Sequence, residues 1–102
     1  MRVIAKKTLI TFYLAHKDAE QALKAWYDEA AKANWTSPNE IKAQYRNASF
    51  IGSNRVIFNI SGNKYRLIVA VAYQHKAVFI KFIGTHEAYD TVDALKVGDA
   101  NR

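Results

Sequence analysis

Residues 62–90, GNKYRLIVAVAYQHKAVFIKFIGTHEAYD, decide the fold. They hold two nearly continuous apolar runs, 65–73 and 77–83, which flank the short polar connection QHK at 74–76. A third β-prone run, RVIFNI at 55–60, precedes the turn-forming residues SGNK. Short, turn-rich connections join antiparallel neighbours, so residues 55–83 predict an antiparallel meander of three strands.

Alternation along these strands separates two faces of the predicted sheet. One face is apolar and suited to receive helices, whereas the other carries polar and cationic side chains. Ordinary solvent exposure explains any one of these cations alone, so only their grouping favours a function. The apolar face consists of Val56, Phe58, Ile60, Leu67, Val69, Val71, Val78, Ile80 and Phe82, and the opposite face carries Arg55, Asn59, Arg66, Phe79 and Lys81.

Sequence patterns in the N-terminal half of the chain predict helices. Residues 2–5 (RVIA) are typical of a short strand, and residues 6–16 keep their apolar side chains on one helical face. Asp18 is predicted to be the N-cap of a second helix, which ends near Asn34. The sequence S-P-N-E at 37–40 indicates the start of a third, short helix.

The fold class that follows is α+β. We expect the two N-terminal helices to pack on one face of a small, mainly antiparallel sheet, which combines the short N-terminal strand with the three-strand C-terminal meander. Residues 47–54 are expected to form a loop, and residues 91–102, with only a weak apolar pattern, to fray. The length suits a single domain over residues 1–102.

The composition limits the class of protein further. Half of the residues are hydrophobic and 13% are aromatic, which excludes a disordered chain. Without cysteine there is no disulfide framework and no thiolate zinc site. The N-terminus lacks the pattern of a signal peptide, and no apolar run reaches the ~20 residues of a membrane span. We therefore expect a cytoplasmic protein with no membrane contact.

The positive charge is concentrated in one part of the chain. The formal net charge is +6, yet no acidic residue occurs between Glu40 and Glu87. RNA or DNA is a natural partner of such a field, because binding releases counterions from the phosphates. Solubility and an acidic protein partner remain alternatives. Within this interval we expect Arg46, Arg55, Asn63, Lys64 and Lys76 to contact RNA.

Three side chains of the opening stretch suit cleavage of RNA without a metal. The RNA 2′-hydroxyl attacks the adjacent phosphorus when a base takes its proton, an acid protonates the leaving 5′-oxygen and cations stabilise the phosphoryl oxygens. We expect Arg66 and Lys81 to hold that phosphate as catalytic cations. Histidine is the side-chain type that titrates nearest neutral pH, so His86 is the first candidate for proton transfer.

Tyr89 and Asp90 share a helical face with His86 through their i, i+3, i+4 spacing. Tyr89 is suited to stack on an unpaired base or to join the proton transfer, and Asp90 is suited to orient His86. A structural hydrogen bond is an equally good interpretation of Asp90. The base thus stays open among these three residues. Metal binding would need ligands beyond His86 and Asp90, and we expect neither a metal nor another cofactor.

Two motifs place these residues in a known context. Residues 58–66 read F-N-x-x-G-N-x-x-R, and residues 85–90 read T-H-x-x-Y-D. With them the chain resembles the HigB-type mRNA interferase toxins of the RelE-like superfamily over nearly its whole length. The residues that match the two motifs include Asn63, Arg66, Thr85, His86, Tyr89 and Asp90.

The resemblance implies a toxin that enters the ribosomal A site and cuts translated mRNA. It also implies a cognate HigA-type helix-turn-helix antitoxin, and an association with DNA only through that antitoxin. A non-catalytic function on the same scaffold is the alternative, because RelE-like proteins include gyrase-directed toxins that act by binding, and a basic sheet suits RNA or the ribosome. The grouping of Arg66, His86 and Tyr89 favours catalysis, since binding alone does not need the histidine.

Overall fold

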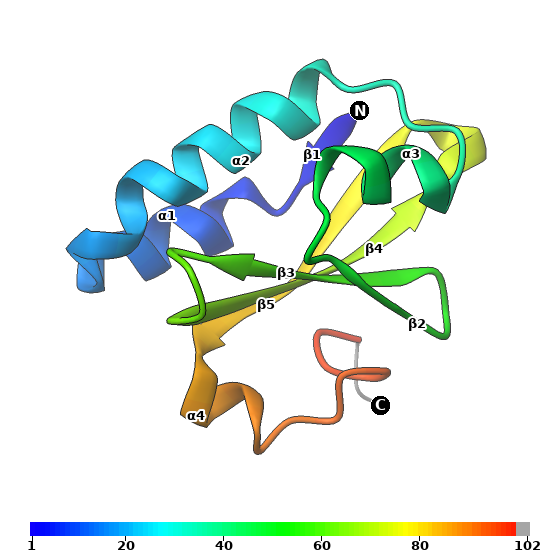
Figure 1. The fold of residues 1–102 in the computed structure, drawn as a ribbon. Coiled ribbons are helices and arrows are strands. Elements are labelled where there is room, and N and C mark those ends of the chain that lie inside the picture. The colour runs from blue at the N-terminus through cyan, green and yellow to red at the C-terminus, as the bar shows by residue number, and fades with distance from the viewer. Residues whose placement is uncertain (100–102) are drawn as a thin grey trace.

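A mixed sheet lies between the two long N-terminal helices and the C-terminal residues (Figure 1). The computed structural model describes residues 1–99 of the chain. The elements in chain order are β1 (Arg2–Ile4), α1 (Lys6–Ala15), the 3₁₀ turn η1 (Lys17–Ala19), α2 (Glu20–Lys32), α3 (Pro38–Gln44), β2 (Ser49–Ile51), β3 (Arg55–Ile60), β4 (Tyr65–Ala72), the 3₁₀ turn η2 (Tyr73–His75), β5 (Ala77–Thr85) and α4 (His86–Tyr89).

The predicted meander is confirmed within a five-stranded sheet of order β1-β5-β4-β3-β2. β3 pairs antiparallel with β4, and β4 pairs antiparallel with β5. β1 runs parallel to β5, with Arg2 opposite Ala77, which confirms the short N-terminal strand. The architecture is therefore α+β and compatible with a RelE-like fold, as predicted.

The loop predicted at residues 47–54 contains the additional strand β2. It pairs antiparallel with β3, with Phe50 opposite Val56. Ser53 and Asn54 close the connection with φ values of 63° and 58°, in the left-handed region that tight turns use. A strand of three residues is too short to show period-two alternation, so the sequence pattern did not identify it.

The helices α1 and α2 cover one face of the sheet, as predicted (Figure 1). Trp26 of α2 contacts Phe58 of β3 edge to face, with ring centroids 5.4 Å apart. Leu9 and Leu23 are also buried in this layer. Burial of each such side chain contributes ~1.5–3 kcal/mol. Within residues 1–99, no helix combines the length and the apolar character required to cross a membrane.

A β-bulge changes which side chains of β5 share a face. Ile68 lies opposite Phe82 and Val69 lies opposite Ile80, so Lys81 is the extra residue. Phe82 consequently belongs to the face away from the helices, while Ile83 packs against the core. The prediction that Phe82 faces the helices is wrong, because strict alternation takes no account of an inserted residue.

Residues 91–99 lie over the second face of the sheet (Figure 1). The N–H of Val97 donates to the carbonyl of Asp93 at 2.8 Å. Gly98, with φ 81°, approaches Lys81 so closely that a Cβ would lie 2.4 Å from the Lys81 carbonyl oxygen. The prediction that this segment frays is wrong for residues 91–99, and residues 100–102 lie outside the described part.

Candidate functional site

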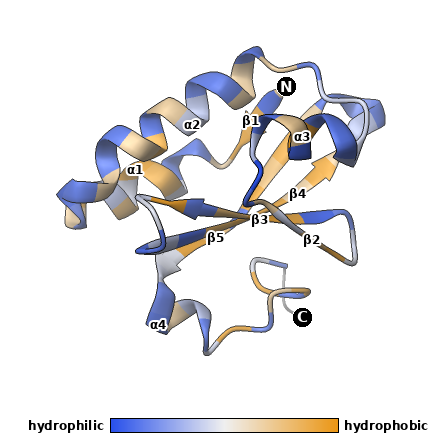
Figure 2. Cartoon of the chain, viewed as in Figure 1, coloured by the Kyte–Doolittle hydropathy of each residue, from blue (hydrophilic) through white to orange (hydrophobic). Residues whose placement is uncertain are grey.

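The start of β4, the end of β5 and α4 meet at one end of the sheet. Arg66 of β4 lies opposite Gly84 of β5, and α4 follows directly after Thr85. Thr85 is the N-cap of α4, because its Oγ1 accepts a hydrogen bond from the Ala88 N–H at 3.1 Å. In Figure 2, α4 begins with a hydrophilic (blue) segment, which follows the largely hydrophobic strand β5.

Arg66 is partly buried, and its guanidinium lies over the ring of Tyr89, with Cζ 5.9 Å from the ring centroid. Its Nη1 donates to the carbonyl of Asn63 at 2.9 Å and to that of Tyr65 at 3.4 Å. The other guanidinium nitrogens have no protein acceptor within residues 1–99. A planar fork that is held in place but keeps free donors is suited to bind a phosphate.

His86, Tyr89 and Asp90 lie together, as their spacing predicts. His86 Nδ1 is 3.3 Å from an Asp90 carboxylate oxygen, and the rings of His86 and Tyr89 are edge to face at 6.4 Å. The Asp90 carboxylate therefore lies on the Nδ1 side of the imidazole ring, and Nε2 is the ring nitrogen farther from it. The side chains of His86 and Asp90 are 51% and 61% exposed, so this pair is open to a substrate.

Asn63 belongs to the turn between β3 and β4, which is consistent with the turn interpretation of Gly62 with its φ of 69°. The side chain of Asn59 donates to Asn63 Oδ1 at 3.2 Å, and Asn59 lies directly opposite Arg66 in the sheet. The sequence places Asn59 on the same face as Arg66, but sequence reasoning missed it as a site residue. Its position in the first motif was the signal that could have identified it.

Lys64 turns towards the helices. Its ammonium forms an ion pair with Asp18, and the Tyr65 hydroxyl donates to the same carboxylate at 2.5 Å. Hydrogen bonds from Lys64 and then from Tyr65 hold the pKa of the Asp18 carboxyl below its usual range. The prediction that Asp18 is the N-cap of α2 is wrong: Ala19 is the N-cap residue, and the Asp18 carboxylate joins the helical hairpin to the start of β4.

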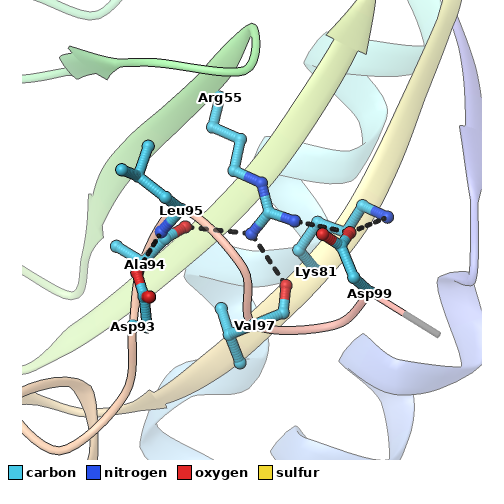
Figure 3. Close-up of polar contacts among 7 residues, drawn as sticks. All are labelled: Arg55, Lys81, Asp93, Ala94, Leu95, Val97 and Asp99. Atoms are coloured by element: carbon cyan, nitrogen blue, oxygen red, sulfur yellow. Dashed lines mark hydrogen bonds and ion pairs between the residues drawn. The ribbon is translucent and has the colours of Figure 1, made fainter. Parts of the chain in front are cut away.

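Arg55 does not face a ligand. It is 2% exposed, and its Nη1 donates to the carbonyls of Ala94 at 2.9 Å and Val97 at 2.7 Å (Figure 3). Its Nη2 donates to Asp99 at 2.8 Å. The prediction that Arg55 contacts RNA is wrong in this structure, because the C-terminal segment occupies its donors.

Lys81 contacts Asp99, the ion-pair partner of Arg55, and does not contact Arg66. Its ammonium lies 3.4 Å from Asp99, and its side chain is 21% exposed (Figure 3). Arg66 lies opposite Gly84, and the three-residue step back along β5 to Lys81 corresponds to about 10 Å. The structure therefore does not place Lys81 beside Arg66 as the prediction of a shared phosphate requires.

The remaining predicted RNA contacts lie at different ends of the sheet. Arg46 is exposed in the connection between α3 and β2, where it lines a depression together with Asn59. Lys76 lies in the connection between β4 and β5, at the opposite end from α4, and its ammonium contacts Asn34. Lys76 is thus remote from Arg66 and His86.

The described residues offer no third ligand for a metal site at His86 and Asp90. Among residues 1–99, no group of three histidine, cysteine or acidic side chains is arranged to hold a metal ion. His86 and Asp90 lie side by side, with Nδ1 3.3 Å from the carboxylate, but they supply only two of the ligands that such a site needs.

Comparison with models of protein families identifies the family to which the chain belongs. Residues 19–92 match the family model of HigB toxins, described as the RelE-like toxic component of a toxin-antitoxin system. The chain belongs to this family. The match extends from the end of η1 to just after α4, so it includes Arg66, His86, Tyr89 and Asp90. A search of curated proteins gave no match.

As a HigB-type toxin, this protein acts within a toxin-antitoxin system, and its family membership implies a cognate antitoxin as partner. The residues that bind Arg55, from Ala94 to Asp99, lie beyond the matched range. The two parts of the basic sheet face thus differ. One part carries the motif residues, and the other is covered by a C-terminal segment outside the family match.

Proposed function

We propose that this HigB-type toxin is an endoribonuclease that cuts mRNA on the ribosome, with the RNA 2′-hydroxyl as nucleophile and without a cofactor. The observation that best supports this proposal is the position of the Arg66 guanidinium over Tyr89, beside the pair of His86 and Asp90. A phosphate-binding fork and a titratable imidazole at one open site are the groups that this reaction needs.

In the proposed reaction each bond change and each proton transfer is assigned to a group. The 2′-oxygen bonds to phosphorus as the P–O5′ bond breaks, which yields a 2′,3′-cyclic phosphate and a 5′-hydroxyl. His86 Nε2 accepts the 2′-proton while Asp90 orients the ring through Nδ1. Arg66 stabilises the charge on the non-bridging oxygens, and the Tyr89 hydroxyl donates the proton to the leaving 5′-oxygen.

The openness of the site supports a role for the ribosome. With half or more of the His86 and Asp90 side chains exposed, the toxin alone surrounds little of a bound nucleotide. Precise positioning accounts for a large part of the rate in reactions of this kind. A message already held in the ribosomal A site would supply the positioning that the open surface lacks.

Cleavage of one mRNA, free and on programmed ribosomes, tests the proposal. We expect much faster cleavage on ribosomes, and rates at least about 10²-fold lower for Arg66→Ala and His86→Ala. Lys76→Ala is the matched control, because it removes an exposed cation remote from the site. Circular dichroism would check that each variant folds.

Two outcomes would contradict parts of this proposal. Equal rates on free and ribosomal mRNA would identify a ribosome-independent ribonuclease. If wild-type protein leaves both RNAs intact yet arrests growth with blocked DNA replication, the protein is instead a binding toxin directed at gyrase.

A further inference from the structure

A polar depression adjoins the site on the outer edge of β3. β2 pairs with β3 only up to Ile57, so from Phe58 onward this edge has no strand partner within residues 1–99. The connection between α3 and β2 lies across from the uncovered edge. Between them is an open depression of ≈ 290 Å³, lined in part by Arg46, Asn47 and Asn59.

The polar groups of this depression suit a nucleotide. Its lining includes the cation Arg46 and no acidic side chain. Arg46 is exposed and forms no ion pair within residues 1–99, so its guanidinium is available to a phosphate. Exposed Asn47 lies next to it and adds an amide that can bind a sugar or a phosphate oxygen.

The pair of Asn59 and Asn63 adds the capacity to read a base. One hydrogen bond joins the two side chains and uses one amide donor and one amide acceptor. Whichever way the amides are turned, the pair keeps one carbonyl oxygen and one NH₂ group for a ligand. A neighbouring donor and acceptor are what an asparagine offers to the edge of a nucleobase.

Asn59, which lines the depression, is also the neighbour of Arg66 in the sheet. Asn59 lies directly opposite Arg66 in the sheet, and side chains in such positions are only ~5 Å apart at Cβ. RNA with its scissile phosphate on Arg66 would therefore carry its neighbouring nucleotide over Asn59 and towards Arg46. An extended single strand with unpaired bases fits this path better than a duplex.

We propose that this depression is a subsite for the nucleotide next to the scissile phosphate. Arg46 binds its phosphate, and the amide pair of Asn59 and Asn63 contacts its base and biases which sites are cut. This inference rests on the proposed function for the chemistry at Arg66. It adds a substrate contact from the connection between α3 and β2, which is remote from the reacting atoms.

Cleavage kinetics on programmed ribosomes test the subsite, with mapping of every cut site. Arg46→Ala is expected to lower kcat/KM about tenfold, mainly through KM, because a charge-assisted phosphate contact is lost. Asn59→Ala is expected to change the distribution of cut sites among codons. Lys76→Ala again serves as the control for loss of one exposed cation.

A binding experiment separates this inference from the proposed function. The probe is a fluorescent 2′-O-methyl oligoribonucleotide, which cannot be cut by this mechanism. Arg46→Ala should weaken its binding and reduce the salt dependence by about 0.7 in log–log slope, as expected for one lost contact to a single strand. This readout applies whether or not the wild-type protein cleaves RNA.

Three results would overturn the subsite. Wild-type KM and unchanged cut sites in both variants would do so while leaving the cleavage proposal intact. Unchanged oligonucleotide affinity of Arg46→Ala would do so even if no cleavage is found. Loss of antitoxin binding by Arg46→Ala, with RNA binding retained, would assign the depression to an acidic segment of the antitoxin instead.

Discussion

Tyr89 occupies the position between the two halves of the proposed site. Its ring lies under the Arg66 guanidinium at 5.9 Å and meets the His86 ring edge to face at 6.4 Å. A phenol in this position offers both an aromatic surface for a base and a hydroxyl for proton transfer. Substitution separates these two capacities, because phenylalanine keeps the ring and removes only the hydroxyl.

We predict that Tyr89→Phe lowers kcat for cleavage on ribosomes about 10²-fold with little change in KM, because the leaving 5′-oxygen loses its acid. Tyr89→Ala should lower kcat similarly and raise KM as well, since stacking is also lost. Steady-state kinetics of the three proteins measures both parameters. Wild-type kcat in Tyr89→Phe would limit Tyr89 to stacking and positioning.

At the scale of elements, Arg55 anchors the C-terminal segment to β3. Its buried guanidinium donates to the partly buried carbonyls of Ala94 and Val97. Asp99 adds an ion pair, but this carboxylate is 53% exposed. The two partners of the same ion pair should therefore contribute very differently to stability.

We predict that Arg55→Leu lowers the free energy of unfolding by about 2–3 kcal/mol, because two partly buried carbonyls lose their charged donor. Asp99→Asn should cost less than about 1 kcal/mol, as is usual for an exposed ion pair. Urea denaturation followed by circular dichroism provides both values. Equally small effects of both substitutions would mean that the segment does not pack on Arg55 in solution.

Asp18 gives the junction between the helical hairpin and β4 a defined dependence on pH. Its pKa is lowered by hydrogen bonds from Lys64 and Tyr65. A carboxyl with a lowered pKa in the folded state stabilises the protein above its unfolded pKa, about 3.9. This contribution is lost as the pH falls through the folded-state pKa.

The stability difference between wild type and Asp18→Asn should accordingly be constant from about pH 7 to pH 5 and shrink below about pH 4. Thermal unfolding across this pH range measures it. Glu20→Gln is a useful comparison, because Glu20 also has a lowered pKa, through Lys24 four residues away, but does not connect α2 to the sheet. A constant difference down to pH 3 would contradict the assigned interaction.

For the whole molecule, local patterns in the sequence were sufficient to predict the main elements and the motif cluster. Helical periodicity and short turns predicted the helices and the meander, and i, i+3, i+4 spacing predicted that His86, Tyr89 and Asp90 meet. Arg66 joins them because β4 and β5 are neighbours in an antiparallel hairpin. The central part of the candidate site thus follows from contacts between segments close in the chain.

The incorrect predictions involve contacts between distant segments or a change of register. Arg55 binds residues 39 to 44 positions away, which no local pattern reveals. One inserted residue in β5 moved Phe82 to the other face and placed Lys81 beside Asp99. The absence of acidic residues between Glu40 and Glu87 showed where the cations cluster in the sequence. It did not show where they lie in space, since Arg55, Arg66 and Lys76 have three different environments.

The division of the basic face also determines what to expect of the toxin as a whole. The Arg66 end is open, whereas the Arg55 end is covered by the chain's own C-terminal segment. RNA that reaches the protein should therefore meet Arg66, His86 and the depression beside β3 first. We propose that this open end cuts mRNA during translation.

Mapping of mRNA 5′ ends after brief induction in cells tests that claim most directly, with wild type compared with Arg66→Ala at equal expression. We predict new ends at discrete positions within translated reading frames, each with a 5′-hydroxyl, and none of them in cells that express Arg66→Ala. Intact mRNA in arrested wild-type cells, or the same ends and the same arrest with Arg66→Ala, would contradict the account.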